Sequence, residues 1–541
     1  MSYIYSTDAA IDCSKENIVD VIVKNCRKFK DQTAFIDSET GNVLTFQGLL
    51  EKSIKISQIL ERKFHYKLDD VVALLLENTS DFWTIVLGCL FSGIAVHLFN
   101  PNSTSYELEN LITRSKPRLI FASDLSLVRA LETKRQFDFV ENVVKTGKPE
   151  AQNDFFYLDA LVDAEVIDEA FEPLEVDMES QVAMIMNSSG TSGLPKSVEL
   201  TYRNLTTILG NAWHPNCLYK TPKDTTVSFC PFYHISGTIV SLLTMISGMV
   251  SVIMPKFHGK KYLELIDDHR ATLLVMVPPI ADFLVQSPLV ADFKLDSVDD
   301  VVCGAAPLAT EIQNVLSKRL NVKVRQMYGL TEVTGITTLT PVTGTSKIGA
   351  VGKVVPGIVA KISPVKTEVP ETIGSYTLGE ICFKSPAVMK GYLHNKTATD
   401  DIIDDEGFLH TGDLGYCDNE GYFYVIDRLK DLIKHKGFQV PPAELEDLLK
   451  SNPEIHDAGV VGKPNRRTGE NPVAFIVLRP GSEMTEDEVK KFISDRLSRE
   501  KQLHEVHFVE ALPKNSTGKT MRRQLRERLA MATEDDNNKI V

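Results

Sequence analysis

Side chains suited to phosphate chemistry gather in one glycine-rich segment of this chain. Residues 188–196 read Ser-Ser-Gly-Thr-Ser-Gly-Leu-Pro-Lys and directly follow an apolar run at Val182–Met186. The glycines let the backbone curl so that successive N–H groups point inward, and the hydroxyls and the lysine add donors, which suits polyphosphate. A Walker A loop leads from Gly-Lys into a helix, whereas Lys196 follows a proline and precedes a strand-like run. The segment therefore predicts a phosphate-binding loop within a hairpin; a flexible turn is the alternative for this segment alone.

Short apolar runs, separated by helical stretches, are the elements that must position this loop. The runs with strand character are Val71–Leu76, Val182–Met186, Leu273–Val277 and Val298–Val302. Such alternation is typical of α/β folds with largely parallel sheets. Near the C-terminus, runs at 459–461 and 473–477 precede a helix in which Thr485 and Glu488 form a capping-box pattern. We interpret this C-terminal part as a separable unit.

The composition excludes several classes of protein. The chain has 541 residues, of which 43% are hydrophobic and 24% charged, and its 59 Lys and Arg against 73 Asp and Glu give a net charge of −14. These globular values exclude extended disorder and coiled coil, and the acidic balance argues against a dedicated nucleic-acid binder. The eight cysteines form no zinc-type cluster, the N-terminus is unlike a signal peptide, and the ending is unlike Ser-Lys-Leu, so we expect a cytoplasmic protein.

One long apolar stretch could instead indicate a membrane span. Residues 225–255 contain no Asp, Glu, Lys or Arg, and Ile235–Met254 is apolar enough to cross a bilayer. Prolines, glycines and serines interrupt the stretch, and Asp224 and Lys256 close it. A buried helix followed by a strand at Val250–Met254 is the better interpretation, so we predict no transmembrane segment.

Six further segments carry residue types found at nucleotide sites. They are Pro-Phe-Tyr-His at 231–234, Cys-Gly-Ala-Ala-Pro-Leu at 303–308, Gln-Met-Tyr-Gly-Leu-Thr-Glu at 326–332, Thr-Gly-Asp at 411–413, Lys-Asp-Leu-Ile-Lys-His-Lys-Gly-Phe-Gln at 430–439 and Pro-Lys-Asn-Ser-Thr-Gly-Lys at 513–519. With the glycine-rich loop, they resemble in type and order the motifs of the adenylate-forming superfamily, which includes acyl-CoA synthetases, luciferases and peptide-synthetase adenylation domains. The resemblance covers roughly residues 17–529 and is strongest for the 4-coumarate–CoA ligase and luciferase-like branch.

This resemblance implies a site for ATP and Mg²⁺. The residues implied for the nucleotide are Ser188, Ser189, Gly190, Thr191, Ser192, Gly193, Lys196, Gly304, Ala305, Ala306, Gln326, Tyr328, Gly329, Asp413 and Arg428. Within this set, Tyr328 is expected to stack on adenine, and Asp413 and Arg428 to hold the ribose. Glu332, together with Thr191, is the expected Mg²⁺ ligand, because Mg²⁺ prefers oxygen donors such as carboxylate.

The resemblance also implies catalytic residues, an acid pocket and a path for coenzyme A. The implied catalytic residues are Lys519, His234, Thr331, Lys434 and Gln439. The implied acid pocket comprises His234, Ser236, Val240, Met327 and Thr334, with Gly304, Ala305 and Gly329 as further candidates. Lys256, Lys436 and Gly437 are implied for CoA, and Lys430 for a hinge. Met327 stands where this branch usually has glycine, and we expect its long side chain to narrow the pocket.

The expected fold is α/β, with a large N-terminal region of packed α/β subdomains plus a β-barrel-like subdomain (residues 1–428) and a small mobile α+β domain (residues 429–541).

The expected function is an ATP-dependent acid–CoA ligase that forms an acyl-adenylate, releases pyrophosphate and passes the acyl group to CoA. Alternatives are a luciferase-like or carrier-protein-loading enzyme with another acceptor, and a non-catalytic binding protein. The acid stays open between aromatic, medium-chain and short-chain compounds. We expect a carboxylic acid, ATP and CoA as partners, no nucleic acid, and a monomer or weak homodimer.

Overall fold

The first of two large sheets carries the hairpin around the glycine-rich loop. The computed structural model describes residues 3–10, 16–149, 154–188, 195–365, 372–373, 376–435, 438–465, 467–497, 499–515 and 518–538. This sheet has the order β22 (Gly391–Tyr392), β10 (Lys196–Thr201), β9 (Val182–Ser188), β5 (Ala95–Leu98), β4 (Val71–Leu75), β6 (Leu119–Ala122), β7 (Asn142–Lys145), β8 (Phe156–Tyr157). β9 and β10 pair antiparallel with Ser188 opposite Lys196, which confirms the hairpin, and the strands from β9 to β8 run parallel.

The second sheet is parallel in its centre. Its order is β17 (Lys353–Val354), β16 (Thr338–Leu339), β15 (Val324–Tyr328), β14 (Asp300–Cys303), β13 (Leu273–Met276), β11 (Thr225–Ser228), β12 (Val250–Ile253), β2 (Thr33–Asp37), β3 (Val43–Thr45). The strand predicted from Val298 begins at Asp300 instead, because the Val298 N–H donates to Leu295 in a turn. β13 ends at Met276 because Val277 already caps helix α10 (Pro278–Gln286), which starts with two prolines.

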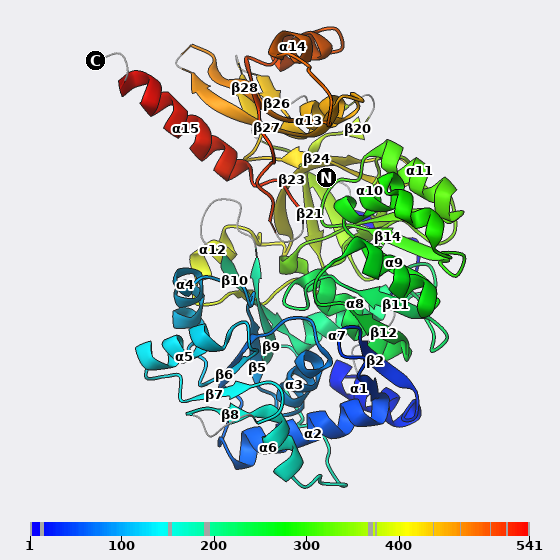
Figure 1. The fold of residues 1–541 in the computed structure, drawn as a ribbon, viewed down its shortest axis with the longest axis vertical. Coiled ribbons are helices and arrows are strands. Elements are labelled where there is room, and N and C mark those ends of the chain that lie inside the picture. The colour runs from blue at the N-terminus through cyan, green and yellow to red at the C-terminus, as the bar shows by residue number, and fades with distance from the viewer. Residues whose placement is uncertain are drawn as a thin grey trace.

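Helices pack on and between these sheets around one large hydrophobic core (Figure 1). They are α1 (Ile18–Lys28), α2 (Phe46–Arg62), α3 (Ser80–Phe91), α4 (Ser105–Ser115), α5 (Leu127–Gln136), α6 (Leu158–Ala164), α7 (Tyr202–Ala212), α8 (Ile235–Ser247), α9 (Gly259–Asp268), α10 and α11 (Thr310–Leu320). Every residue of α8 except Ser236 is buried, and β12 follows it, so the interpretation as core helix and strand is confirmed. Among the described residues, no helix is both long and apolar enough to cross a membrane.

A third sheet forms a half-barrel next to the two large sheets. Its antiparallel strands are β1 (Ile4–Tyr5), β18 (Val359–Ser363), β21 (Gly379–Lys384), β23 (Leu409–Cys417) and β24 (Phe423–Arg428). The short pair β19 (Thr372–Ile373) and β20 (Tyr376–Thr377) and helix α12 (Lys396–Asp400) lie in the same stretch of chain. The mixed α/β fold with a half-barrel agrees with the fold class expected from the sequence.

The C-terminal elements form a smaller group at one end of the molecule, drawn orange to red in Figure 1. They are β25 (Ile433–His435), β26 (Phe438–Val440), α13 (Pro442–Lys450), β27 (Ile455–Asn465), β28 (Gly469–Leu478), α14 (Glu486–Ser494), β29 (Glu505–Phe508) and α15 (Arg522–Asn538). Their strands make a separate sheet, and a core cluster of their own fills it. β24 ends at Arg428, the residue after which the domain boundary is predicted; that boundary stays a prediction.

Candidate active site

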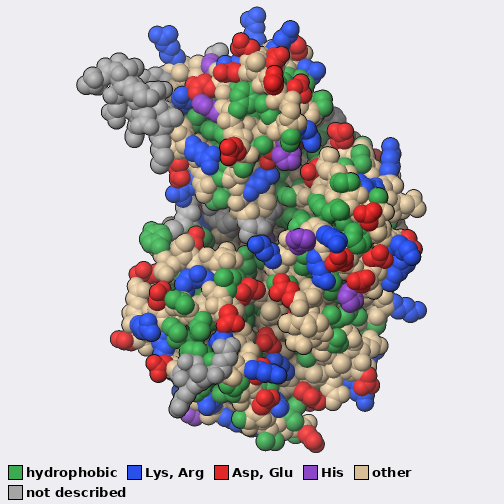
Figure 2. Space-filling model, viewed as in Figure 1, with side chains coloured by type: hydrophobic (Ala, Val, Ile, Leu, Met, Phe, Trp, Pro, Cys, Tyr) green, Lys and Arg blue, Asp and Glu red, His purple; other side chains and the backbone are tan. Residues whose placement is uncertain are grey.

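A cavity of about 500 Å³ lies where the two large sheets, the half-barrel and the C-terminal group meet. Its lining comes from the β9–β10 hairpin and β22, from the start of α8, from β13 to β15 and the turn that follows them, from β21, β23 and β24, and from the loop before α15. Acidic and basic side chains are intermixed over the face of the molecule shown in Figure 2. The described side chains on this face therefore form no patch of a single charge sign, and the charged residues considered for ligand binding are those that line the cavity.

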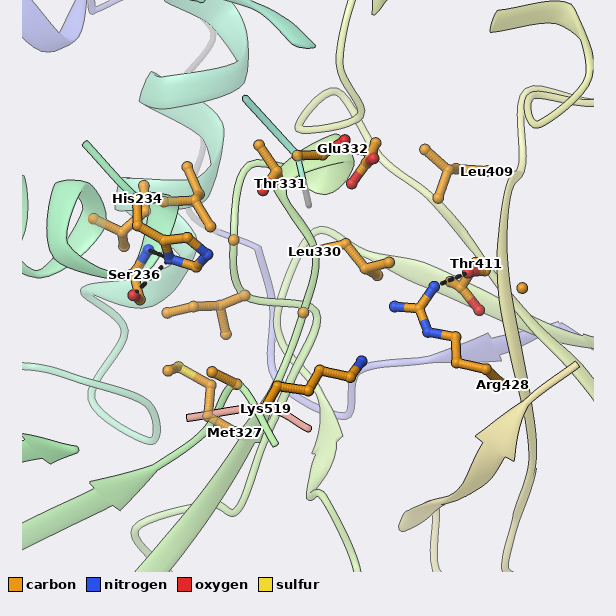
Figure 3. A pocket seen from close by; sticks show the side chains of 18 of the residues that line it. His234, Ser236, Met327, Leu330, Thr331, Glu332, Leu409, Thr411, Arg428 and Lys519 are labelled. Atoms are coloured by element: carbon orange, nitrogen blue, oxygen red, sulfur yellow. Dashed lines mark hydrogen bonds between the residues drawn. The ribbon is translucent and has the colours of Figure 1, made fainter. Parts of the chain in front are cut away.

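Figure 3 shows that the cavity has two unlike sides with a lysine between them. His234 and Ser236 lie on one side and Arg428 lies on the other. Lys519 starts near Met327 and extends toward the middle. The cavity thus brings together residues that are far apart in the sequence and that come from both predicted domains.

His234 stands at the first turn of α8 and faces the cavity. It is the N-cap of that helix, where its Nδ1 accepts from the Ser236 N–H at 3.4 Å and lies 2.9 Å from the Ser236 hydroxyl. Because Nδ1 accepts, the neutral ring carries its proton on Nε2. Burial lowers the pKa of His234 to about 4, so the ring is neutral at physiological pH.

The acid-pocket residues predicted from the sequence divide into two groups. Ser236, Val240 and Met327 line the cavity together with His234. Thr334 does not line it: this buried residue has a positive φ of 55°, and its hydroxyl donates to the Ala387 carbonyl at 2.6 Å. In the structure Thr334 holds the turn after β15, and its role in the acid pocket stays a prediction.

The opposite side of the cavity is built on a buried carboxylate. Arg428, on β24, bonds through Nε to one oxygen of Asp413 at 2.6 Å, and the Tyr328 hydroxyl donates to the other oxygen at 2.5 Å. Burial, followed by the charge of Asp413, raises the pKa of Tyr328 well above its usual value. Arg428 lines the cavity, whereas Asp413 and Tyr328 do not. Stacking of Tyr328 on adenine and binding of ribose by Asp413 stay predictions.

A second carboxylate fixes the backbone beside Asp413. Glu380 accepts from the Gly412 N–H at 2.8 Å through Oε1, and its Oε2 lies 2.7 Å from His410 Nδ1. Glu380, His410 and Gly412 all line the cavity. The sequence predicted no role at the site for Glu380, His410 or Gly412. Glu380 lies on β21, which carries none of the motifs.

Glu332 occupies the upper edge of the cavity in Figure 3, next to Thr331. Its Oε1 accepts from the Tyr392 hydroxyl at 2.9 Å, and the Lys196 ammonium lies 4.5 Å from the centre of the Tyr392 ring. The pairing of β22 with β10 brings Tyr392 next to Lys196. Glu332, Lys196 and Ser188 line the cavity, and their roles toward Mg²⁺ and the nucleotide stay predictions; Tyr392 also lines it and is a residue that the sequence did not reveal.

Lys519 reaches the cavity from a tight turn of the C-terminal group. Its backbone N–H donates to Asn515 Oδ1 at 2.9 Å, and the Asn515 N–H donates to the Lys519 carbonyl at 3.0 Å. Burial, and then the charge of Arg428, lowers the pKa of Lys519. Burial also lowers the pKa of Lys430 to about 8, and the charges of Arg428 and Lys519 act in the same direction. The cations are thus close enough to repel one another, which favours an anionic ligand between them.

Other predicted residues lie away from the cavity or outside the described residues. Ser189, Gly190, Thr191, Ser192, Gly193, Lys436 and Gly437 are not among the described residues, and Gln439 is described only as part of β26. Ala305 and Gly329 line the cavity, while Gly304, Ala306, Gln326, Lys256 and Lys434 do not. Gln326 is buried and donates to Gln313 at 3.0 Å. The roles assigned to all of these residues stay predictions.

The arrangement suits an amphipathic ligand. Arg428, Lys430 and Lys519 can hold an anionic group, and much of the remaining lining is aliphatic, including residues of α8 next to His234. The sequence did not single out these aliphatic residues, which include Leu218, Ile239, Val275, Val302 and Ile336.

Comparison with known proteins relates the whole chain to enzymes. A family model described as AMP-binding enzyme matches residues 22–393, and one described as AMP-binding enzyme C-terminal domain matches residues 444–519. The chain is 37% identical over 503 residues to luciferin 4-monooxygenase of Nipponoluciola cruciata, covering 91% of each protein. It is 36% identical to 4-coumarate-CoA ligase 1 of Narcissus pseudonarcissus, covering 94% of this chain and 92% of that protein.

Solved structures share the fold over nearly the full length. ATP-bound MatB from Rhodopseudomonas palustris aligns with a TM-score of 0.84 at 26% identity, covering 95% of this chain and 99% of that chain. The o-succinylbenzoate CoA synthetase of Bacillus subtilis, in complex with its acyl-adenylate intermediate, aligns with a TM-score of 0.79 at 26% identity, covering 94% and 97%. The resemblance stated from the sequence motifs is confirmed.

Proposed function

The chain belongs to the AMP-binding enzyme family, and from this premise we propose that it is an ATP-dependent acid–CoA ligase. The observation that carries the proposal is the single cavity that joins Lys519 and Arg428 to the aliphatic side next to His234. A cationic side suits the phosphate of an acyl-adenylate, and an aliphatic side suits its acyl group. Relatives named 4-coumarate-CoA ligase support CoA as the acceptor.

In the first step, a carboxylate oxygen of the acid attacks the α-phosphorus of ATP. The bond from this phosphorus to the oxygen that bridges to the β-phosphate breaks, and pyrophosphate leaves. Lys519 offsets the negative charge that develops at the α-phosphate, and Arg428 with Asp413 orients the ribose. The neutral His234 directs the acid from the other side. Catalysis of this kind rests on positioning and electrostatics.

The residues present fit the Mg²⁺ that this chemistry needs. The carboxylate of Glu332 lines the cavity and is fixed by the hydrogen bond from Tyr392, and carboxylate oxygen is a donor that Mg²⁺ prefers. When bound there, Mg²⁺ supplies positive charge that reduces the repulsion between the acid and the phosphates. Thr191, the second expected ligand, lies outside the described residues.

In the second step, the thiol of CoA attacks the acyl carbonyl carbon. A carbon–sulfur bond forms, the bond from this carbon to the phosphate oxygen breaks, AMP leaves with the bonding electrons, and the thiol proton goes to solvent. Lys519 occupies the cavity that the second reaction also needs, so the C-terminal domain rotates about Lys430. In this proposal the rotation brings Lys434 and the segment 436–439 to the site, with Lys256 on the CoA path.

A luciferase-like reaction is the second candidate, and the identity to luciferin 4-monooxygenases favours it. Both candidates share the adenylation step and differ in the acceptor. In the alternative, molecular oxygen rather than the CoA thiol reacts with the acyl-adenylate.

The test is a screen for pyrophosphate release over a panel of carboxylic acids, with and without CoA. We expect acid-dependent release of pyrophosphate and an acyl-CoA product when CoA is present. Acyl-adenylate without any thioester, accompanied by oxygen uptake, would favour the luciferase-like reaction. Binding of ATP without turnover of any acid would indicate a non-catalytic protein.

A further inference from the structure

Aliphatic side chains make up much of the cavity lining, and three of them, Ile235, Ile239 and Val240, lie on α8, the helix that His234 caps. The apolar lining residues that belong to the large hydrophobic core or pack against it include Leu218, Ile235, Ile239, Val240, Val275, Val302, Met327 and Ile336. Among the described lining residues the aromatic one is Tyr392, which bonds to Glu332 at the phosphate edge. Apart from the imidazoles of His234 and His410, an aromatic acid therefore finds no further ring to stack on among the described lining residues.

Polar and charged acyl groups are poorly matched to this wall. The described charged residues of the lining are Lys196, Glu332, Glu380, Asp401, Arg428, Lys430 and Lys519, and none of them lies on α8, β13 or β14, the elements that carry Val240, Val275 and Val302. The Ser236 hydroxyl lies 2.9 Å from Nδ1 of His234 and is engaged with that ring. A second carboxylate in the acyl group would meet no cation on α8, β13 or β14, and a phenol hydroxyl could use only the acceptor lone pairs of Ser236 there.

Two valines close the aliphatic end of the cavity. Val240 and Val275 line the main cavity, and both also line a second, very small cavity of about 10 Å³. The other walls of the small cavity include Thr226, Phe229 and Cys230. Since the two valines border both spaces, they separate them. The main cavity must also hold the nucleotide within its 500 Å³, so the acyl chain has limited room.

We propose that the acid is an unbranched, saturated monocarboxylate of medium chain length, and that Val240 and Val275 set the length limit. The inference rests on the proposed function, because it names the acid that the same cavity activates. A straight aliphatic chain needs no hydrogen-bond partner and packs against branched aliphatic side chains and the flexible Met327. Carbons beyond the limit would have to displace the two valines.

The experiment measures kcat/KM for pyrophosphate release with butanoate, hexanoate, octanoate, decanoate, dodecanoate and hexadecanoate, and with 4-coumarate and succinate for comparison. We expect a maximum at hexanoate to decanoate, and rates for 4-coumarate and succinate lower by about tenfold or more, since mismatched groups in a hydrophobic pocket cost at least that factor.

Variants of the two valines test the length limit. Val240→Ala and Val275→Ala join the two cavities, so the ratio of kcat/KM for dodecanoate over octanoate should rise by about tenfold or more. Val240→Phe should move the maximum to shorter acids. Val227→Ala is the matched control, because Val227 lines the small cavity but not the main one, and it should keep the preferred length while Val240 and Val275 still separate the two spaces. A gain with a longer acid cannot come from misfolding.

The possible failures can be told apart. Faster reaction with 4-coumarate than with every aliphatic acid would overturn the acid class while leaving the ligase proposal intact. An unchanged length preference in both alanine variants, or an equal shift in Val227→Ala, would overturn the role of the two valines. Absence of pyrophosphate release with all acids would contradict the proposed function itself.

Discussion

Lys519 and His234 are the two residues whose surroundings decide most about the chemistry. Burial, followed by the charge of Arg428, lowers the pKa of Lys519, and His234 is kept neutral by burial at the start of α8. The sequence predicted both residues through short motifs. It could not predict the aliphatic wall, because Leu218, Val275 and Val302 come from separate elements and apolar residues occur throughout such elements.

Lys519 can be tested by separating the two half-reactions. Lys519→Ala should reduce adenylation by about 10²–10³-fold, the usual loss when one group that stabilises developing charge is removed. Thioester formation from supplied acyl-adenylate should be largely spared. Lys514→Ala is the matched control, since Lys514 pairs with Asp457 at 2.6 Å and does not line the cavity. Equal loss of both half-reactions would contradict the assignment of Lys519 to the first one.

The neutral state of His234 has a consequence for stability. Its pKa is lowered from 6.5 to about 4, so between these values the unfolded chain binds a proton that the folded chain excludes. The free energy of unfolding is therefore unaffected by the titration of His234 above pH 6.5, and it falls by about 1–3 kcal/mol as the pH drops toward 4. His234→Asn keeps an N-cap residue and removes this titration. We expect the Tm of the wild type to fall more than that of the variant between pH 7 and pH 4.5; parallel curves would contradict the buried neutral ring.

Secondary-structure elements place these residues, and the sequence indicated several elements correctly. The β9–β10 hairpin is present, and the Thr485 capping box with Glu488 opens α14. The ends of strands were predicted less accurately. The strand predicted from Val298 starts at Asp300 in β14, because Val298 lies in a turn. Local patterns determine such elements, whereas the position of Thr334 depends on a contact with Ala387 that is distant in sequence.

The loop before α15 can be tested at Gly518. This glycine has a φ of +81°, and a Cβ added to it would lie 2.7 Å from Pro279 Cγ on α10. Gly518→Ala should therefore push the turn that carries Lys519 away from α10 and slow adenylation by about tenfold or more, because a displacement of about 1 Å in a catalytic group can cost up to about 10²-fold.

Gly481→Ala is the matched control for this substitution. Gly481 has a similar φ of +88°, but a Cβ there meets nothing within 4 Å. In the control, alanine at a positive φ should lower the Tm, while the rate of adenylation should stay unchanged. Equal adenylation rates in the two variants would contradict the contact between this loop and α10.

At the scale of the whole molecule, a buried ion pair crosses the predicted domain boundary. Arg522 on α15 bonds to Asp427 on β24 at 2.9 Å and to Glu446 on α13 at 2.7 Å. Asp427 also accepts from the Ala443 N–H at 2.7 Å. These contacts hold the C-terminal group in the arrangement in which Lys519 reaches the cavity, so a rotation about Lys430 has to break or replace them.

Asp427→Asn should therefore shift the balance between the two half-reactions. Weakening the pair destabilises the adenylation arrangement by about 1–3 kcal/mol, so the ratio of thioester formation to adenylation should rise about 5- to 150-fold. Arg526→Gln is the control, since Arg526 pairs with Asp431 on the same side of the predicted boundary. An unchanged ratio in Asp427→Asn would argue against the pair as a domain contact.

The most direct test of the central claim is the stoichiometry of one purified reaction. Octanoate, ATP and CoA are mixed with the protein, and pyrophosphate, AMP and octanoyl-CoA are quantified together over time. Two half-reactions in one cavity predict equal amounts of all three products. Pyrophosphate formed with acyl-adenylate and no thioester, at saturating CoA, would contradict the account.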